Sequence, residues 1–273
     1  MRPIRTISVF PTLLTLGNLV CGFFAIVVAA RVEKPESIAW NFVDTTNVMI
    51  SGCLIFLAMV FDGLDGYVAR LSRTASDFGA QLDSLCDVVT FGVAPGFLLV
   101  KMCPRFTYLH SQAVWVIAAS YAACAALRLA RFNVETGDED EHLQFNGLPS
   151  PAAAGAIAGF AIMFFALRNA DNPLIFARKI DDLLQTVLPF YGVMLALLMV
   201  SRISYPHVVN QIFRGQRSFG HVVAVIFAFV AVMVMVPGYS IPIVFCVFAF
   251  YGPVSLVWRK IMHRQQQDDN SLF

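Results

Sequence analysis

Four aspartates recur at helical spacing between residues 62 and 87, where the sequence reads DGLDGYVARLSRTASDFGAQLDSLCD. An α-helix turns by about 100° per residue, so two groups of these residues each fall on one helix face. The first face carries Asp62, Asp65, Gly66, Ala69 and Arg70, and the second carries Gly79, Asp83 and Asp87. If the two helices pack antiparallel across the short connection from 71 to 78, the carboxylates converge.

Converging carboxylates provide the oxygen ligands that hard divalent cations prefer, and Mg²⁺ commonly combines a few of them with substrate phosphates. The glycines leave room for a ligand to approach the backbone. The planar guanidinium of Arg70 can donate paired hydrogen bonds to a phosphate. The pattern therefore favours a site for a metal-bound diphosphate.

The segments around these aspartates are apolar, reading SGCLIFLAMVF before them and VVTFGVAPGFLLV after them. An aspartate at the centre of a membrane-spanning helix costs roughly 2.5–3.5 kcal/mol, so each one needs a compensating partner. A solvated acidic loop does not fit such flanks. We expect the aspartates to line an enclosed polar site within a membrane protein.

The whole composition agrees with a membrane protein. Hydrophobic residues make up 58% of the 273 residues, charged residues only 14%, and the mean hydropathy is +0.70. A soluble domain carries about 25% charged residues, which excludes that class. Stretches long enough to span a bilayer predict an all-α, polytopic bundle of about eight transmembrane helices, near residues 12–30, 48–69, 80–100, 113–132, 151–167, 183–200, 220–236 and 240–257.

The distribution of basic residues predicts an orientation. With the N-terminus in the cytoplasm, 12 of the 19 Lys and Arg residues fall in cytoplasmic segments, against 7 on the other side. Both termini and the loop between the two acidic faces would then lie in the cytoplasm. We expect an integral protein of the cell (inner) membrane with its active site on that side.

Charge and cysteine usage exclude other classes of site. The net charge of +1 and the scattered basic residues give no surface for nucleic acid. The six cysteines show no paired spacing, so neither disulfides nor zinc is expected. No internal repeat or linker divides the chain, which indicates one membrane domain.

The acidic segment resembles the signature of the CDP-alcohol phosphotransferase family, Asp-x-x-Asp-Gly-x-x-Ala-Arg, eight residues, then Gly-x-x-x-Asp-x-x-x-Asp, and every fixed position is matched. The resemblance implies two Mg²⁺ or Mn²⁺ ions, for which the metal ligands would be Asp62, Asp65, Asp83 and Asp87. It implies Asp87 as the general base that activates the attacking hydroxyl. Around the nucleotide and its diphosphate it implies Asp62, Gly66, Ala69, Arg70 and Gly79, with Arg70 taking up charge on the phosphoryl oxygens.

Further segments resemble the phosphatidylserine synthase branch of that family: TLGNLVCGFFAI, FGVAPGFLL, LRLARFNV, FNGLPSPAAAG and LMVSRISYP. The resemblance implies CDP-diacylglycerol as donor, L-serine as acceptor, release of CMP, and a homodimer. Because the predicted site offers no evident activated serine or cysteine, we expect no covalent enzyme intermediate. The resemblance also divides the chain into a six-helix core at 1–206, a two-helix extension at 207–258 and a polar tail at 259–273. Glycerol 3-phosphate, inositol or inositol phosphate are alternative acceptors, and a cation channel or transporter is the alternative from another class.

Four polar residues outside the signature are candidates for the substrate pocket. Arg128, Arg131 and Asn133 follow one another near the end of a predicted helix, where arginines need an anion such as a serine carboxylate or a donor phosphate. The alternative is that the arginines reach lipid headgroups. Asn18, in the first hydrophobic stretch, would bind the cytidine or ribose or else form a hydrogen bond between helices.

Overall fold

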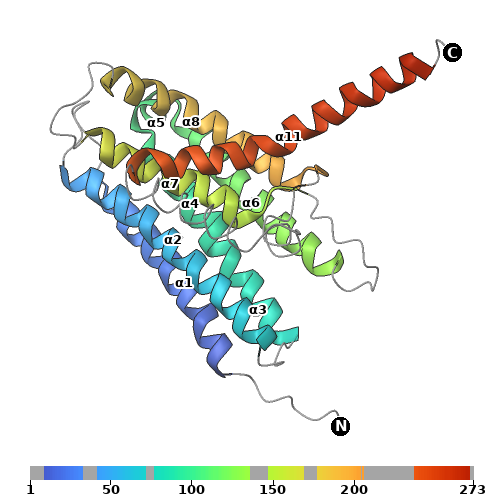
Figure 1. Cartoon of the computed structure of the whole chain (residues 1–273). Coiled ribbons are helices and arrows are strands. Elements are labelled where there is room, and N and C mark those ends of the chain that lie inside the picture. Colours follow the sequence, from blue (N-terminus) through green and yellow to red (C-terminus); the bar gives the residue numbers. More distant parts are fainter. Residues whose placement is uncertain are drawn as a thin grey trace, which may run out of the picture.

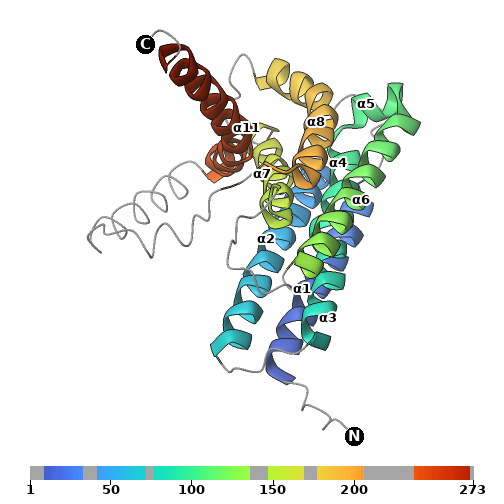
Figure 2. The ribbon, with the colours of Figure 1, turned by 90° about the vertical axis from the view of Figure 1, so that its right-hand side faces the viewer.

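A computed structural model describes residues 9–32, 42–71, 77–135, 147–168, 177–203, 205 and 237–270. Within these ranges the regular structure is entirely helical. The elements are α1 (Val9–Ala30), α2 (Phe42–Leu71), α3 (Asp77–Asp87), η1 (Val88–Val93), α4 (Ala94–Met102), α5 (Pro104–Leu109), α6 (Ser111–Glu135), α7 (Ser150–Arg168), α8 (Ala177–Val200) and α11 (Pro237–Asn270). Figures 1 and 2 show α1 and α2 running side by side, with α3 packed against α1.

In the part of the chain that the structure describes, seven helical segments are long and apolar enough to cross a membrane. They are Phe10–Ala30, Asp44–Val68, Phe78–Met102, Gln112–Val134, Ser150–Arg168, Lys179–Val200 and Gly238–Leu256. Each coincides with a stretch predicted from the sequence, which confirms the all-helical membrane bundle. The remaining predicted stretch, at 220–236, lies outside the described residues.

The third span is not one regular α-helix but the succession α3, η1 and α4. In η1, a π-helical turn, the N–H of Ala94 donates to the carbonyl of Val89, five residues earlier. Pro95 follows at once; a proline has no N–H to donate, and its ring crowds the carbonyl four residues before it. The widened turn relieves that crowding. It begins directly after Asp87, so the last signature aspartate lies at the junction of two helix types.

The central helix α7 is built largely from small residues, which lets its neighbours approach closely. A Cβ added to Gly52 of α2 would lie 2.8 Å from the carbonyl oxygen of Ala158. A Cβ on Gly159 would lie 3.0 Å from the backbone of Pro242 in α11. These contacts hold α2, α7 and α11 together at the core, where interhelical packing takes the place of the hydrophobic effect.

Helix α11 runs antiparallel to α7. Its Gly238 packs on Ala166 near the end of α7, and its Gly252 packs on the ring of Tyr205 at the other end. The hydroxyl of Tyr205 donates to the carbonyl of Ala249 at 2.9 Å. In Figure 1, α11 extends beyond the bundle and continues to Asn270, through much of the polar tail expected from residue 259.

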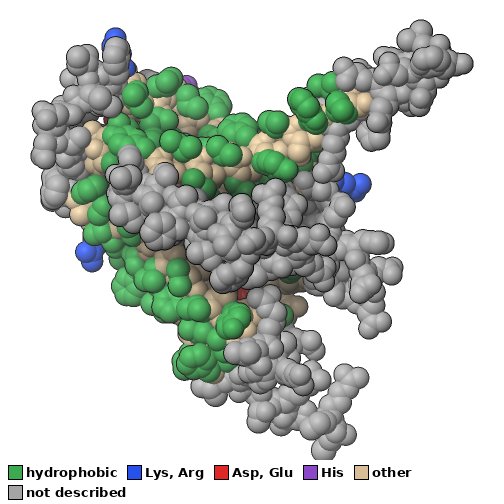
Figure 3. Space-filling model, in the orientation of Figure 1, with side chains coloured by type: hydrophobic (Ala, Val, Ile, Leu, Met, Phe, Trp, Pro, Cys, Tyr) green, Lys and Arg blue, Asp and Glu red, His purple; other side chains and the backbone are tan. Residues whose placement is uncertain are grey.

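The outside of the bundle is apolar, as a membrane environment requires. Large hydrophobic side chains are exposed on most of the spans, and Figure 3 shows hydrophobic side chains covering much of the described surface on that face, with the visible Lys and Arg near its edges. Buried charged side chains are few, and among the most buried are the aspartates Asp65 and Asp87.

Candidate active site

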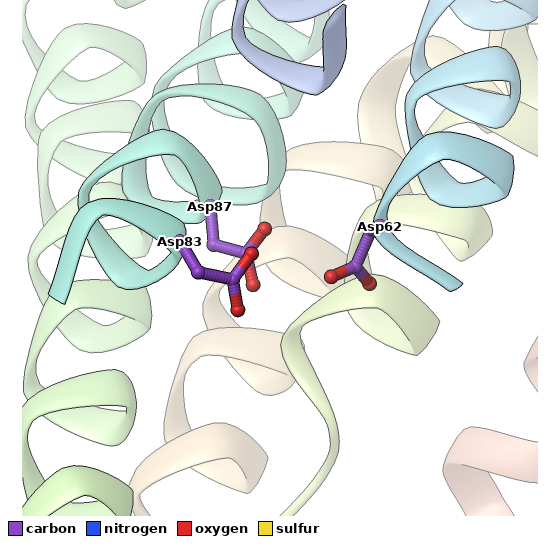
Figure 4. Close-up of side chains that lie close together, drawn as sticks. All are labelled: Asp62, Asp83 and Asp87. Atoms are coloured by element: carbon purple, nitrogen blue, oxygen red, sulfur yellow. The ribbon is translucent and has the colours of Figure 1, made fainter. Parts of the chain in front are cut away.

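Three signature aspartates converge between α2 and α3. Asp62 comes from α2, and Asp83 and Asp87 come from α3. Figure 4 shows their carboxylates pointing toward one another from the two helices, and one oxygen of each lies within 4.8 Å of the others. Asp87 is buried and the other two are partly buried. The carboxylates of the two predicted helix faces therefore converge, and α1 packs against both helices that carry them.

The fourth aspartate, Asp65, lies close to this group without belonging to its tightest part. Asp65 is only 5% exposed, and its Oδ2 is buried without a hydrogen-bond partner among the described residues. The Oδ1 of Asp83 is also buried without a hydrogen-bond partner among the described residues. Buried carboxylate oxygens without partners are costly in a protein interior. Both oxygens are suited to a ligand that brings positive charge.

Helix α1 also contributes to the site. The Nδ2 of Asn18 donates to the Oδ1 of Asp87 at 2.9 Å, in a contact that is buried from solvent. The carbonyl of Asn18 accepts a hydrogen bond from the hydroxyl of Thr90 at 3.3 Å. Of the two roles considered for Asn18, the structure thus shows the hydrogen bond between helices.

The three candidates on α6 differ in their surroundings. Nη1 of Arg128 donates to Oγ of Ser150 at 2.8 Å, while its charge interacts with those of Asp62 and Asp87. Nη1 of Arg131 donates to the carbonyl of Val200 at 3.1 Å, at the end of α8. Arg128 therefore interacts electrostatically with two of the aspartates, whereas Arg131 is hydrogen-bonded to the backbone.

Asn133 is engaged with the helix that carries two of the aspartates. Its Nδ2 donates to the hydroxyl of Ser84 at 2.8 Å, and Ser84 follows Asp83 directly in α3. This contact ties the end of α6 to α3. In this structure Asn133 supports the acidic helix.

The signature residues other than the aspartates are placed in three ways. A Cβ added to Gly66 would meet nothing within 4 Å, so there is open space beside α2 at that position. Gly79 lies in α3, one turn before Asp83. Ala69 and Arg70 lie near the end of α2, and their side chains are outside the described part of the structure.

The side chains that are present fit a divalent cation. The donor set consists of carboxylate oxygens on two helices, and two of the nearby carboxylate oxygens have no hydrogen-bond partner among the described residues. The charge of Arg128 interacts with those of Asp62 and Asp87. Hard cations such as Mg²⁺ and Mn²⁺ favour oxygen ligands of this kind. The arrangement can also accept a proton from a substrate hydroxyl, because a carboxylate is a proton acceptor.

Sequence reasoning missed the partners that hold the candidates in place: Ser84, Thr90 and Ser150. Ser150 begins α7 and precedes Pro151, a combination typical of helix starts, so the sequence indicated a helix entry there. Its contact with Arg128 joins residues 22 positions apart, and no local pattern signals such a pairing. Ser84 and Thr90 form similar long-range contacts.

Comparisons with known proteins agree on one family. The sequence profile described as CDP-alcohol phosphatidyltransferase matches residues 8–236. A CDP-diacylglycerol–serine O-phosphatidyltransferase of Methanocaldococcus jannaschii is 36% identical over 213 residues, covering 78% of this chain and 80% of the relative. One of Helicobacter pylori strain J99 is 33% identical over 208 residues, covering 75% of each. An archaetidylserine synthase of Methanothermobacter thermautotrophicus is 35% identical over 158 residues, covering 57% of each.

Proposed function

This chain belongs to the CDP-alcohol phosphatidyltransferase family, and we propose that it transfers the phosphatidyl group of CDP-diacylglycerol to the hydroxyl of L-serine and releases CMP. The observation that carries the proposal is the convergence of Asp62, Asp83 and Asp87 within 4.8 Å, with Arg128 near enough to interact electrostatically with Asp62 and Asp87. Serine as the acceptor rests on the names of the similar proteins from M. jannaschii and H. pylori.

The proposed reaction is one direct displacement. The serine oxygen forms a bond to the lipid-linked phosphorus, the bond from that phosphorus to the oxygen of CMP breaks, and CMP leaves with the bonding electrons. The hydroxyl proton goes to Asp87, which is buried and projects into the group of carboxylates. Within the site the described side chains include no evident activated serine or cysteine nucleophile, so the chain has no need of a covalent intermediate.

The carboxylates of Asp62, Asp83 and Asp87, with Asp65 nearby, would hold the divalent cations. When bound, Mg²⁺ or Mn²⁺ neutralises the diphosphate and stabilises the negative charge that develops on the leaving nucleotide. The open space beside Gly66 can take part of the nucleotide close to the backbone of α2. Arg70 is proposed to contact the phosphoryl oxygens, since the signature places it on the same face of α2.

Arg128 is proposed to bind the carboxylate of serine. Its Nε is buried and has no hydrogen-bond partner among the described groups, while its Nη1 is fixed by Ser150. A guanidinium can form two parallel hydrogen bonds with a carboxylate, which suits an amino-acid acceptor. A phosphorylated acceptor such as glycerol 3-phosphate would call for more basic residues than the sequence supplies near the signature.

The chain is an integral membrane protein, as its seven described spans show. We propose that it resides in the cell (inner) membrane with the aspartates toward the cytoplasm, where soluble serine and CMP occur. The homodimer, the core at 1–206 and the two-helix extension at 207–258 stay predictions.

An acceptor screen tests the function. Purified full-length protein in detergent or nanodiscs is supplied with CDP-diacylglycerol, Mn²⁺ and one acceptor at a time, and CMP release is followed. Serine should support turnover, whereas ethanolamine, which lacks the carboxylate, should be a poor acceptor. Preferred use of glycerol 3-phosphate or inositol would refute serine while keeping the family reaction.

A further inference from the structure

The first helix makes two contacts with the junction that follows Asp87, and these contacts are one turn apart on α1. Asn18 bonds to Asp87 and Thr90, as described above. Gly22 lies directly against Thr90: a Cβ at this position would come 2.9 Å from the Thr90 Cα. Helix α1 is therefore pressed against η1 where the signature helix ends.

The direction of the Asn18 side chain follows from hydrogen-bond chemistry. The amide nitrogen is the atom that faces Asp87, which is the orientation that an ionised carboxylate requires, because such a group only accepts hydrogen bonds. The other end of the amide, Oδ1, is buried without a partner among the described residues. The amide thus donates one of its two N–H groups to Asp87, and Asn18 itself is fully buried.

The hydrogen bond from Asn18 also restricts the orientation of the Asp87 carboxylate. Asn18 engages Oδ1 of Asp87 from the side of α1, while Asp62 and Asp83 approach the same carboxylate within 4.8 Å. One of its oxygens is thereby held by a neutral donor, which restricts rotation of the carboxylate about its last bond. In metal sites, residues that orient the ligands in this way typically change metal affinity or activity by about 10- to 100-fold when they are replaced.

We propose that Asn18 is a positioning residue, whose amide holds Asp87 in the orientation that directs it toward Asp62 and Asp83, with Thr90 fixing Asn18 in turn. This role differs from nucleotide binding, which was one of the two alternatives that the sequence left open for Asn18. It rests on the proposed function only in that the three carboxylates form a cation site.

The test compares three full-length variants with the parent protein. Asn18→Leu keeps a similar volume and removes the donor to Asp87. Thr90→Val keeps the shape of the threonine and removes the donor to the Asn18 carbonyl. The matched control is Ser51→Ala, which removes another fully buried hydrogen bond between α2 and α1, from Ser51 Oγ to the carbonyl of Ala25 at 2.8 Å. Ser51 lies about 16 Å along α2 from Asp62.

The readout is the affinity for Mn²⁺ in the presence of saturating CMP, measured by electron paramagnetic resonance, together with the melting temperature. Asn18→Leu should weaken Mn²⁺ binding by roughly 10-fold or more, and Thr90→Val should weaken it less. Ser51→Ala should lower the melting temperature and leave Mn²⁺ affinity at the parent value.

Two outcomes would overturn the proposal. If Asn18→Leu and Ser51→Ala bind Mn²⁺ equally well, Asn18 only packs α1 against the bundle. If Asn18→Leu weakens CMP binding without Mn²⁺ and leaves Mn²⁺ affinity unchanged, Asn18 contacts the nucleotide. A parent protein that releases no CMP with serine would refute the proposed acceptor instead, because the Mn²⁺ comparison needs no acceptor.

Discussion

The guanidinium of Arg128 donates a hydrogen bond to the hydroxyl of Ser150 at 2.8 Å, and this contact joins α6 to the first residue of α7. Ser150 is fully buried. The guanidinium is therefore held by Ser150, while its charge interacts with those of Asp62 and Asp87. Its buried Nε has no partner among the described residues and is available to an anionic substrate group.

Replacing Arg128 with alanine should weaken the apparent affinity for serine by roughly 10- to 100-fold, because a hydrogen bond to a charged group contributes about 1.5–3 kcal/mol. The affinity for CDP-diacylglycerol should change much less. Steady-state kinetics of CMP release, with each substrate varied in turn, gives both values.

Arg131→Ala is the matched control for this variant. Arg131 donates to the carbonyl of Val200, so its loss should lower the melting temperature and leave the KM for serine nearly unchanged. If instead both variants raise the KM for CDP-diacylglycerol and leave that for serine unaltered, the arginines bind the donor phosphate. The serine site would then lie elsewhere.

The main features of the fold and of the acidic site could be predicted because both depend on local periodicity. Spans show as apolar stretches of about 20 residues, and the seven that the structure describes lie where the hydropathy placed them. The convergence of Asp62 with Asp83 and Asp87 follows from helical spacing and a short connection. These patterns are contained within a few turns of one or two helices.

Contacts between distant segments could not be predicted in the same way. Asn18 and Asp87 are 69 residues apart, and Ser84 and Asn133 are 49 residues apart. Which residue faces which across two helices depends on their rotation and register, and single-sequence patterns do not specify either. The π-helical turn after Asp87 shifts that register again, and it was not predicted from the sequence.

Removal of divalent cations should abolish activity. Asp62, Asp83 and Asp87 bring negative charge together in a largely buried site, and the donor substrate adds a diphosphate. Without a cation, the repulsion between these groups opposes donor binding. Protein treated with EDTA and passed over a desalting column should show no CMP release, and Mg²⁺ or Mn²⁺ should restore it. Full turnover in a metal-free preparation would contradict the site.

Asp87→Asn should reduce turnover more than it reduces donor binding, because the amide keeps the shape of the carboxylate but can neither accept the hydroxyl proton nor carry its charge. We expect kcat to fall by about 10²- to 10⁴-fold, the usual contribution of a general base. Asp44→Asn is the control, since Asp44 is also buried but lies at the other end of α2. Equal losses of turnover and of CDP-diacylglycerol binding would show that Asp87 acts as a metal ligand and not as the general base.

Gly66→Ala should impair donor binding without weakening the fold. The added Cβ meets no protein atom within 4 Å, and alanine favours a helix over glycine by about 1 kcal/mol, so the melting temperature should stay equal or rise. The methyl group would occupy space proposed for the nucleotide, and the KM for CDP-diacylglycerol should increase about 10-fold or more. Gly63→Ala is the control, because that position is equally open but is a variable position of the signature. Equal KM values for CDP-diacylglycerol in the two variants would show that the nucleotide does not occupy the space beside Gly66.

The positions at which α8 ends and α11 begins predict a further membrane crossing between these two helices. The chain leaves α8 beside the start of α7, where the N–H of Leu148 donates to the carbonyl of Leu198, and Tyr205 packs on Gly252 at that same end. After Tyr205 the next described residue is Pro237, which begins α11. Its neighbour Gly238 packs on Ala166 near the opposite end of α7. Residues 206–236 therefore connect the two ends of the bundle. Since 220–236 is the apolar stretch within them, we expect it to make the eighth crossing.

Single cysteines in a variant without the six native cysteines test this topology, with a membrane-impermeant maleimide applied to intact cells. A cysteine at Arg202 or in the loop 72–76 should be protected, while one at Pro237, at His110 or in the segment 33–44 should react. Labelling of Arg202 and Pro237 from the same side would exclude a crossing between them. Reaction at 72–76 with protection at 33–44 would invert the orientation, and would place the aspartates away from cytoplasmic serine.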